Sequence, residues 1–265
     1  MEEPRSPVGN ELADSDRADW LASRETWRPY PSRSPYVRPE PYSLDWFNWV
    51  ERRRYSRHGQ WILKLLEFDR HENEQVLCLG DGLGTDWVRY AIGGAQVTIG
   101  SPMSELLQLA RKQFELRGLN GEFCHTPLSS LPARTDTVDV VCLSGLSAPL
   151  DLNSGVVDEI YRVLRPGGKL IAVVPAFRSV AYWQSWLQPW LRLFPASEAP
   201  AERGYTARQI CELLGRFRSH SVSKRHLRRS DLPHLWRCML LPVAERWMGQ
   251  FLVLKAFKPL STAIA

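Results

Sequence analysis

Short apolar runs alternate with stretches of helical spacing between residues 75 and 175. The apolar runs predict strands at 75–79, 96–99, 121–125, 138–143 and 169–174, and the helical patterns lie at 85–92, 103–117 and 155–164. Strands that are separated by helix-length segments are typical of a mainly parallel sheet with right-handed crossovers. The pattern therefore predicts an α/β fold.

The alternation weakens after Pro175. A Trp-rich stretch of helical spacing covers 182–194, and residues 206–214 form an amphipathic pattern that Thr206 can cap. A basic segment at 216–229 and an apolar run at 250–257 follow. We expect the last strands to form an antiparallel pair at one edge of the sheet.

The first part of the chain differs in composition. Residues 1–41 hold seven of the 19 prolines and show no clear period, which predicts a disordered or loosely attached leader. Residues 42–74 have a helical rhythm and predict an N-terminal extension over the sheet edge. We assign 75–260 to the main domain, with a Trp-rich insertion at about 178–203.

The first predicted strand ends in a glycine-rich loop, in the sequence VLCLGDGLGTD. Gly80 and Gly82 carry no Cβ and allow a ligand to approach the backbone, while the amides of the following helix point at it. The dinucleotide fingerprint is G-x-G-x-x-G, and Thr85 stands where its last glycine would be. The loop therefore predicts a bound cofactor other than a dinucleotide.

Four segments in order make a more specific pattern: VLCLGDGLGTD, VTIGSPMSELLQLARKQFELRG, VDVVCLSGL and EIYRVLRPGGKLIAVVP. With these segments the chain resembles class I S-adenosylmethionine-dependent methyltransferases over residues 75–175, and more weakly over 205–258. The resemblance implies a Rossmann-like, doubly wound, mainly parallel seven-stranded sheet with helices on both faces. It also implies S-adenosyl-L-methionine as cofactor.

By position, the resemblance implies a cofactor site along the carboxyl ends of the first, second and fourth strands. The residues carried over to it are Gly80, Asp81, Gly82, Leu83, Gly84, Ser101, Pro102, Leu128, Ser129 and Ser144.

Three positions depart from the family, which usually has acidic residues there. Cys78 stands where an acid holds the cofactor's ammonium, Ser101 where one binds the ribose hydroxyls, and 126–130 where one binds the adenine. A serine accepts fewer and weaker hydrogen bonds than a carboxylate. Asp81 and Asp86 are possible substitutes, although an acid at Asp86 also suits the first turn of a helix.

Four residues are candidates for the substrate side of the site: Tyr55, His58, Gly145 and Trp183. Gly145 follows the fourth strand. Tyr55 and His58 lie in an arginine-rich stretch that either covers the pocket or forms a solvated helical face. Trp183 begins a stripe of tryptophans that either packs on the core or covers a substrate.

Composition narrows the class of protein. The net charge is +5, the pI is about 9.0 and 24% of residues are charged, which is ordinary for a globular protein. Three of the five cysteines lie in strand-like runs and none forms a C-x-x-C pair, so we expect reduced thiols, a cytoplasmic location and no zinc site. No run is long enough to span a bilayer, and we expect no membrane partner.

The leading hypothesis is a methyltransferase that transfers a methyl group to a small-molecule acceptor by in-line displacement. Such a reaction depends on positioning in a dry pocket, and the sequence identifies no catalytic base. His125 at the end of a strand has a structural interpretation as well. The alternatives are an inactive binding protein that keeps the fold, and a nucleic-acid-binding methyltransferase that uses the basic segment.

Overall fold

The computed structural model describes residues 14–26, 39–56, 59–80, 82–144, 152–179, 182, 204–227, 232 and 240–260. The N-terminal elements are α1 (Asp14–Thr26), α2 (Leu44–Arg54), α3 (Gln60–Leu66) and the 3-10 helix η1 (Phe68–Arg70). The central ones are β1 (Gln75–Leu79), α4 (Thr85–Ile92), β2 (Gln96–Ser101), α5 (Ser104–Leu116), β3 (Glu122–His125), β4 (Val138–Leu143), α6 (Ser154–Val163) and β5 (Leu164–Pro175). The last are α8 (Ala207–Leu213), β6 (Ser219–Arg225), α9 (Leu241–Met248) and β7 (Phe251–Phe257).

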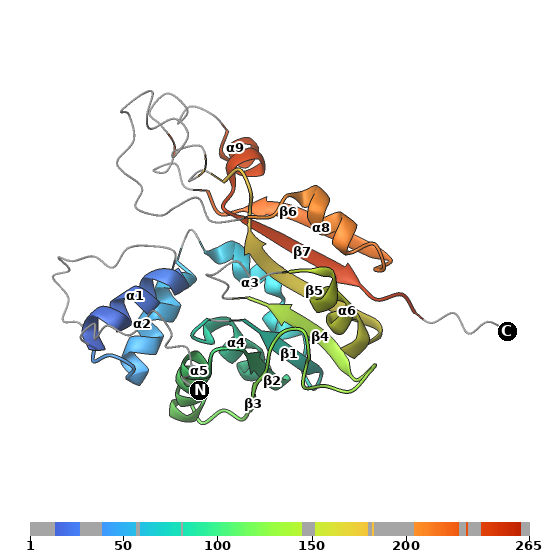
Figure 1. Cartoon of the computed structure of the whole chain (residues 1–265). Coiled ribbons are helices and arrows are strands. Elements are labelled where there is room, and N and C mark those ends of the chain that lie inside the picture. The colour runs from blue at the N-terminus through green and yellow to red at the C-terminus, as the bar shows by residue number, and fades with distance from the viewer. Residues whose placement is uncertain are drawn as a thin grey trace, which may run out of the picture.

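The strands form one seven-stranded sheet in the order β3-β2-β1-β4-β5-β7-β6. All pairs from β3 to β5 are parallel, and β7 runs antiparallel to both β5 and β6. The chain thus leaves β1 for β2 in one direction and reaches β4 in the other (Figure 1). This confirms the predicted Rossmann-like, doubly wound sheet, and the β1–β4 boundary is its switch point.

Each face of the sheet is covered by helices. Side chains alternate along the central strands, so Leu77 and Leu79 pack on the face with α6 and α8, while Val76 and Cys78 pack on the face with α3, α4 and α5. This alternation within continuous apolar runs is what a sheet buried on both faces requires. Among the described helices, none has the length and apolar character needed to cross a membrane.

Residues 14–26 correct the prediction of a disordered or loosely attached leader. They form α1, whose Ala18, Leu21 and Ala22 are buried against α2 and against Leu83 in the glycine-rich loop. Figure 1 shows α1 and α2 side by side, next to α5. The rest of 1–41 lies outside the described residues, apart from 39–41.

The fifth strand is longer than predicted. It begins at Leu164, and residues 165–168 bulge opposite Asp139 because Val138 pairs with Leu164 and Val140 pairs with Lys169. Gly167 takes a φ of +80° there, and Arg165 forms an ion pair with Asp139. Residues 165–168, which lie between the predicted helix and the predicted strand, therefore form a bulge inside the strand.

Glu67 links the N-terminal helices to strands β5 and β7 of the sheet. Its carboxylate accepts hydrogen bonds from Lys169 on β5 and from Lys255 on β7, the latter at 2.6 Å. Burial would raise the pKa of Glu67, but the two lysines outweigh it and lower that pKa from 4.5 to about 2.

We expect this carboxylate to make stability depend on pH. Because its folded pKa lies below the unfolded value of 4.5, its contribution is present above that pH and lost as pH falls toward 2. A shift of this size corresponds to about 3 kcal/mol. Urea unfolding of Glu67→Gln should show that loss at neutral pH and a flatter pH dependence below pH 4.5. The exposed Glu72→Gln is the control, and equal pH profiles for wild type and Glu67→Gln would contradict the assignment.

Candidate functional site

The glycine-rich loop joins the carboxyl end of β1 to the first turn of α4. Gly84 precedes the helix with a φ of +84°, and a Cβ there would lie 3.1 Å from the Ala110 Cβ and 3.1 Å from the Trp87 ring. Only glycine fits both the backbone conformation and this space. Gly80, Gly82 and Leu83 are buried around the same turn, and Asp81 lies outside the described residues.

The end of β2 supplies the second group of predicted residues. Ser101 is buried and its Oγ accepts the Met103 amide at 3.2 Å, just before α5 begins. The His125 ring lies 3.0 Å from the carbonyl of Pro102, so it supports the backbone that follows β2. This is the structural role that the sequence left open for His125.

The segment after β3 turns toward the core. The Ser101 carbonyl accepts the amide of Thr126 at 3.1 Å. Leu128 is buried in the core cluster on the α6 and α8 face, whereas Ser129 is exposed. Leu128 is therefore part of the apolar core, whereas the Ser129 side chain faces solvent.

Ser144 at the end of β4 is the most unusual polar residue of the group. It is fully buried, and its Oγ has no hydrogen-bond partner within the described part of the chain. Its amide donates to the carbonyl of Leu79 at 3.3 Å, which holds the ends of β1 and β4 together. A buried hydroxyl without a partner costs free energy, so it indicates a group that a ligand can satisfy.

The sheet order brings these positions together. Strands β2, β1 and β4 are neighbours, so the loop at Gly80–Gly84, Ser101 and Ser144 share one edge. Of the four predicted substrate-side residues only Tyr55 is described; His58, Gly145 and Trp183 lie outside the described residues.

Below the loop lies a buried ion pair that the sequence reasoning missed. Arg54 at the end of α2 donates to both oxygens of Asp86, from Nε at 2.7 Å and from Nη2 at 2.5 Å. The Tyr55 hydroxyl donates to the same carboxylate at 2.8 Å. Asp86 is thus bound by Arg54 and Tyr55. This role adds to the two that the sequence left open, a substitute acid at the cofactor site and an acid in the first turn of a helix.

Glu25 on α1 joins this pair to the loop itself. Its carboxylate accepts the Leu83 amide at 3.4 Å and lies 3.8 Å from Nη1 of Arg54, and its backbone carbonyl accepts from the same nitrogen at 2.6 Å. Glu25 is 4% exposed. Helix α1 therefore fixes the backbone of the glycine-rich loop through a carboxylate supplied from outside the main domain.

The electrostatics of this network follow from its burial. Burial would lower the pKa of Arg54, but the charges of Asp86 and Glu25 outweigh it and raise that pKa. Burial raises the pKa of Glu25, with Arg54 acting against the shift. Burial and the charge of Asp86 raise the pKa of Tyr55 well above 10.0. Tyr55 is therefore a neutral hydrogen-bond donor, and its hydroxyl is turned to Asp86.

Cys78 supplies no carboxylate at the position where the family usually has an acid. It is fully buried beside Cys142 on the neighbouring strand, in the core under α4 and α5. Burial, together with a hydrogen bond to Cys142, raises the pKa of the Cys78 thiol well above 9.0. The residue is a neutral, space-filling group.

One signal in the sequence could have located α1. Ala18, Leu21 and Ala22 have the spacing of one helical face, and these are the buried positions of the helix. The surrounding prolines and charges obscured this short pattern. The ion partners of Glu25 and Arg54 lie too far along the chain to be identified from spacing.

Comparison with known proteins agrees with this geometry. Residues 77–172 match the model of the methyltransferase domain family. A ubiquinone/menaquinone biosynthesis C-methyltransferase of Desulfotalea psychrophila is 31% identical over 112 residues, which is 41% of this chain and 45% of that protein. A demethylmenaquinone methyltransferase of Clavibacter sepedonicus is 34% identical over 100 residues, or 37% of this chain and 40% of that protein. The chain spans about half or less of the length of these relatives.

Solved structures share the fold. A methyltransferase of Methanosarcina mazei has a TM-score of 0.52 at 21% identity and covers 74% of this chain and 97% of its own. A methyltransferase from Aquifex aeolicus has a TM-score of 0.53 at 15% identity, and the match covers 81% of this chain and 98% of that one. The chain therefore shares the fold of these solved methyltransferases, and residues 77–172 are similar to the methyltransferase domain family.

We expect the Arg54–Asp86 pair to dominate local stability. Arg54→Met leaves the Asp86 carboxylate buried without its partner, which should cost about 3–5 kcal/mol in urea unfolding. Arg52→Met, two residues earlier on the same helix and exposed, should change stability by less than about 0.5 kcal/mol. Equal effects of the two variants would show that the pair is not coupled to folding.

Gly84→Ala should cost more than its backbone conformation alone explains. Gly118 has a φ of +63° with nothing within 4 Å of an added Cβ, so Gly118→Ala measures the left-handed backbone penalty of about 1–2 kcal/mol. Gly84→Ala adds the contacts with Ala110 and Trp87. We expect it to be the more destabilising of the two in thermal unfolding, and the reverse order would contradict the close packing of the loop.

Proposed function

We propose that this protein is an S-adenosyl-L-methionine-dependent methyltransferase that acts on a small, lipid-soluble aromatic acceptor of the quinone-precursor class. The carrying observation is the shared edge of β1, β2 and β4, where the glycine-rich loop, Ser101 and the unpartnered Ser144 meet inside the matched domain. Ligands of doubly wound sheets bind at this switch point.

The residues present fit the cofactor through backbone and hydroxyl groups. Gly80, Gly82 and Gly84 carry no side chain that would keep a ligand from the loop backbone, and Ser144 offers a buried hydroxyl that has no partner among the described residues. The hydroxyl proton of Ser101 remains free to donate because its oxygen accepts the Met103 amide. The usual carboxylates at Cys78 and Ser101 are replaced, so we expect binding to be weaker than with a full set of acids.

The bound cofactor supplies a methyl group on a positively charged sulfur. The chain positions the two reactants and excludes water: Leu83, Leu128 and Leu143 are buried around the proposed edge. Arg54, Asp86 and Glu25 hold the loop in place from behind. These residues act through geometry, which suits an in-line transfer that depends on orientation.

The acceptor class rests on the named relatives, since both act in the methylation of quinone precursors by name. They match 41% and 37% of this chain, so the acceptor assignment is the finer part of the proposal. A basic or acidic macromolecular substrate is not needed to explain the described site.

A second candidate is a binding protein that keeps the fold without transfer. The observation that favours it is the replacement of the family's acids by Cys78, which is buried and neutral, and by Ser101. Cofactor affinity separates the two candidates.

The test is calorimetric titration with S-adenosylmethionine and, separately, with S-adenosylhomocysteine. We expect binding that Ser144→Ala weakens by roughly threefold to tenfold, the range for one lost neutral hydrogen bond. Because this hydroxyl has no hydrogen-bond partner among the described residues, the same variant should unfold at the wild-type temperature. The exposed Ser104→Ala is the matched control.

Absence of binding by the wild type at millimolar ligand would reject the enzyme and favour the second candidate. Binding that Ser144→Ala leaves unchanged would reject the assigned place of the ligand. Binding followed by methylation of a demethylated quinone would support both parts of the proposal.

A further inference from the structure

Helix α9 is amphipathic in an unusual way, because part of its outward face is apolar. Ala244 and Met248 are buried against Leu227 and Leu232. On the outside, Val243 is 49% exposed and Trp247 is 73% exposed, while Leu240 just before the helix is 72% exposed. Large apolar side chains gathered on one exposed face indicate an interaction site.

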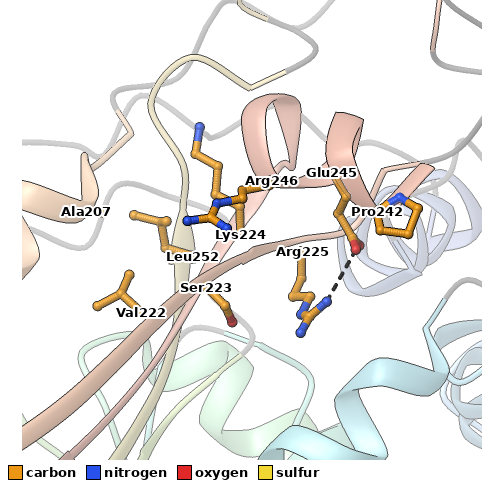
Figure 2. Close-up of a pocket in the computed structure, with 9 residues that line it drawn as sticks. All are labelled: Ala207, Val222, Ser223, Lys224, Arg225, Pro242, Glu245, Arg246 and Leu252. Atoms are coloured by element: carbon orange, nitrogen blue, oxygen red, sulfur yellow. Dashed lines mark hydrogen bonds and ion pairs between the residues drawn. The ribbon is translucent and has the colours of Figure 1, made fainter. Parts of the chain in front are cut away.

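A basic pocket of about 550 Å³ borders this face. Figure 2 shows its residues, which come mainly from β6, β7 and α9. Among the described residues that line it, the cationic side chains are Lys224, Arg225 and Arg246, and the carboxylate is Glu245. Arg246 belongs to both features, since it is exposed on α9 between the pocket and the apolar residues.

The positive charge of the pocket exceeds the negative charge that faces it. Glu245 already pairs with Arg225 at 3.4 Å and accepts the amide of His226 at 2.9 Å. Lys224 donates to the carbonyls of Phe177 at 2.9 Å and Trp247 at 3.1 Å. These carbonyls carry no net charge to balance the lysine.

Arg178 adds to this excess. Burial and the nearby charge of Arg178 lower the pKa of Lys224, as expected where cations gather without enough anions. An anionic group in the pocket would relieve this repulsion.

The pocket opens at the same edge of the sheet as the proposed cofactor site. Strand β6 is parallel to β5, because both are antiparallel to β7. Arg225 at the end of β6 therefore lies at the edge where β1 and β4 also end (Figure 1). A surface docked there would face the acceptor side of the molecule.

We propose that Leu240, Val243, Arg246 and Trp247, together with the adjoining basic pocket, dock on a membrane surface that contains anionic phospholipid. The apolar side chains enter the headgroup boundary, and the cations meet lipid phosphates. Tryptophan suits this boundary, and a helix with one apolar and one basic side lies in it. The sequence predicted no membrane partner because it contains no run long enough to span a bilayer, and docking on a surface needs no such run.

Docking goes beyond the proposed methylation and is testable without it. If the acceptor is lipid-soluble, docking would place the site next to the membrane in which the acceptor dissolves. Only this advantage rests on the proposed function. Two other occupants are outcomes of the test: a soluble phosphorylated molecule in the pocket, or a second copy of this chain on the apolar face.

The test is flotation of the full chain with vesicles of phosphatidylcholine alone and of phosphatidylcholine mixed with phosphatidylglycerol. We expect binding to the mixed vesicles that falls with added salt. Arg246→Glu should lower the partition coefficient at least tenfold, since each charge at the surface contributes about fivefold. Trp247→Glu should do the same by removing the apolar anchor.

Two control variants make the same kinds of substitution, an apolar residue and a cation each replaced by glutamate, at the opposite edge of the sheet. Ile92→Glu alters an apolar side chain that is 51% exposed at the end of α4, and Arg70→Glu alters a cation that is 75% exposed on η1. Both should bind the mixed vesicles as the wild type does. Calorimetry with S-adenosylmethionine on the same variants reports the cofactor site independently.

Three results would overturn the proposal. The first is no vesicle binding by the wild type, or vesicle binding by Arg246→Glu and Trp247→Glu that is as strong as that of the wild type. The second is a thermal shift with pyrophosphate that Arg246→Ala abolishes while vesicles bind nothing, which would assign the pocket to a soluble phosphate. The third is a dimer in solution that Trp247→Glu converts to a monomer without any vesicle binding.

Discussion

The ion pair between Arg54 and Asp86 is the constraint on which the site depends. Both side chains are almost fully buried, so their desolvation is costly and is offset only by good geometry and complete hydrogen bonding. Two bonds from the guanidinium, one from Tyr55 and a carbonyl from Glu25 provide this. The pair joins α2 to the first turn of α4, and so determines where the glycine-rich loop lies relative to the N-terminal helices.

The sequence predicted the elements whose patterns are local. The bounds of β1, α4 and β4 agree with the structure because each is a continuous apolar or helical run between clear breaks. Helix α1 was missed because only Ala18, Leu21 and Ala22 mark its buried face, and its stability comes from tertiary contacts. The predicted strand at 169–174 missed the bulge before it, since glycine and proline specify local backbone shape and not the strand pairing around it.

The location of the candidate site could be predicted from the sequence, but the interactions of its side chains could not. Topology alone places the ends of β1, β2 and β4 at one edge, so Gly84, Ser101 and Ser144 could be grouped in advance. The partner of Asp86 could not, because Arg54 precedes it by 32 residues and belongs to a different layer. The unpartnered hydroxyl of Ser144 is likewise a property of packing, which no spacing rule reveals.

The position of α1 also has a consequence for the order in which the chain is built. Its carboxylate at Glu25 binds an amide 58 residues later, and its Arg17 pairs with Glu105, 88 residues later. During synthesis, α1 can therefore pack on α2 early, but its contacts with Leu83 and Glu105 form only after the glycine-rich loop and α5 have been made. The glycine-rich loop can reach its final shape only when α1, which is made before it, packs on it.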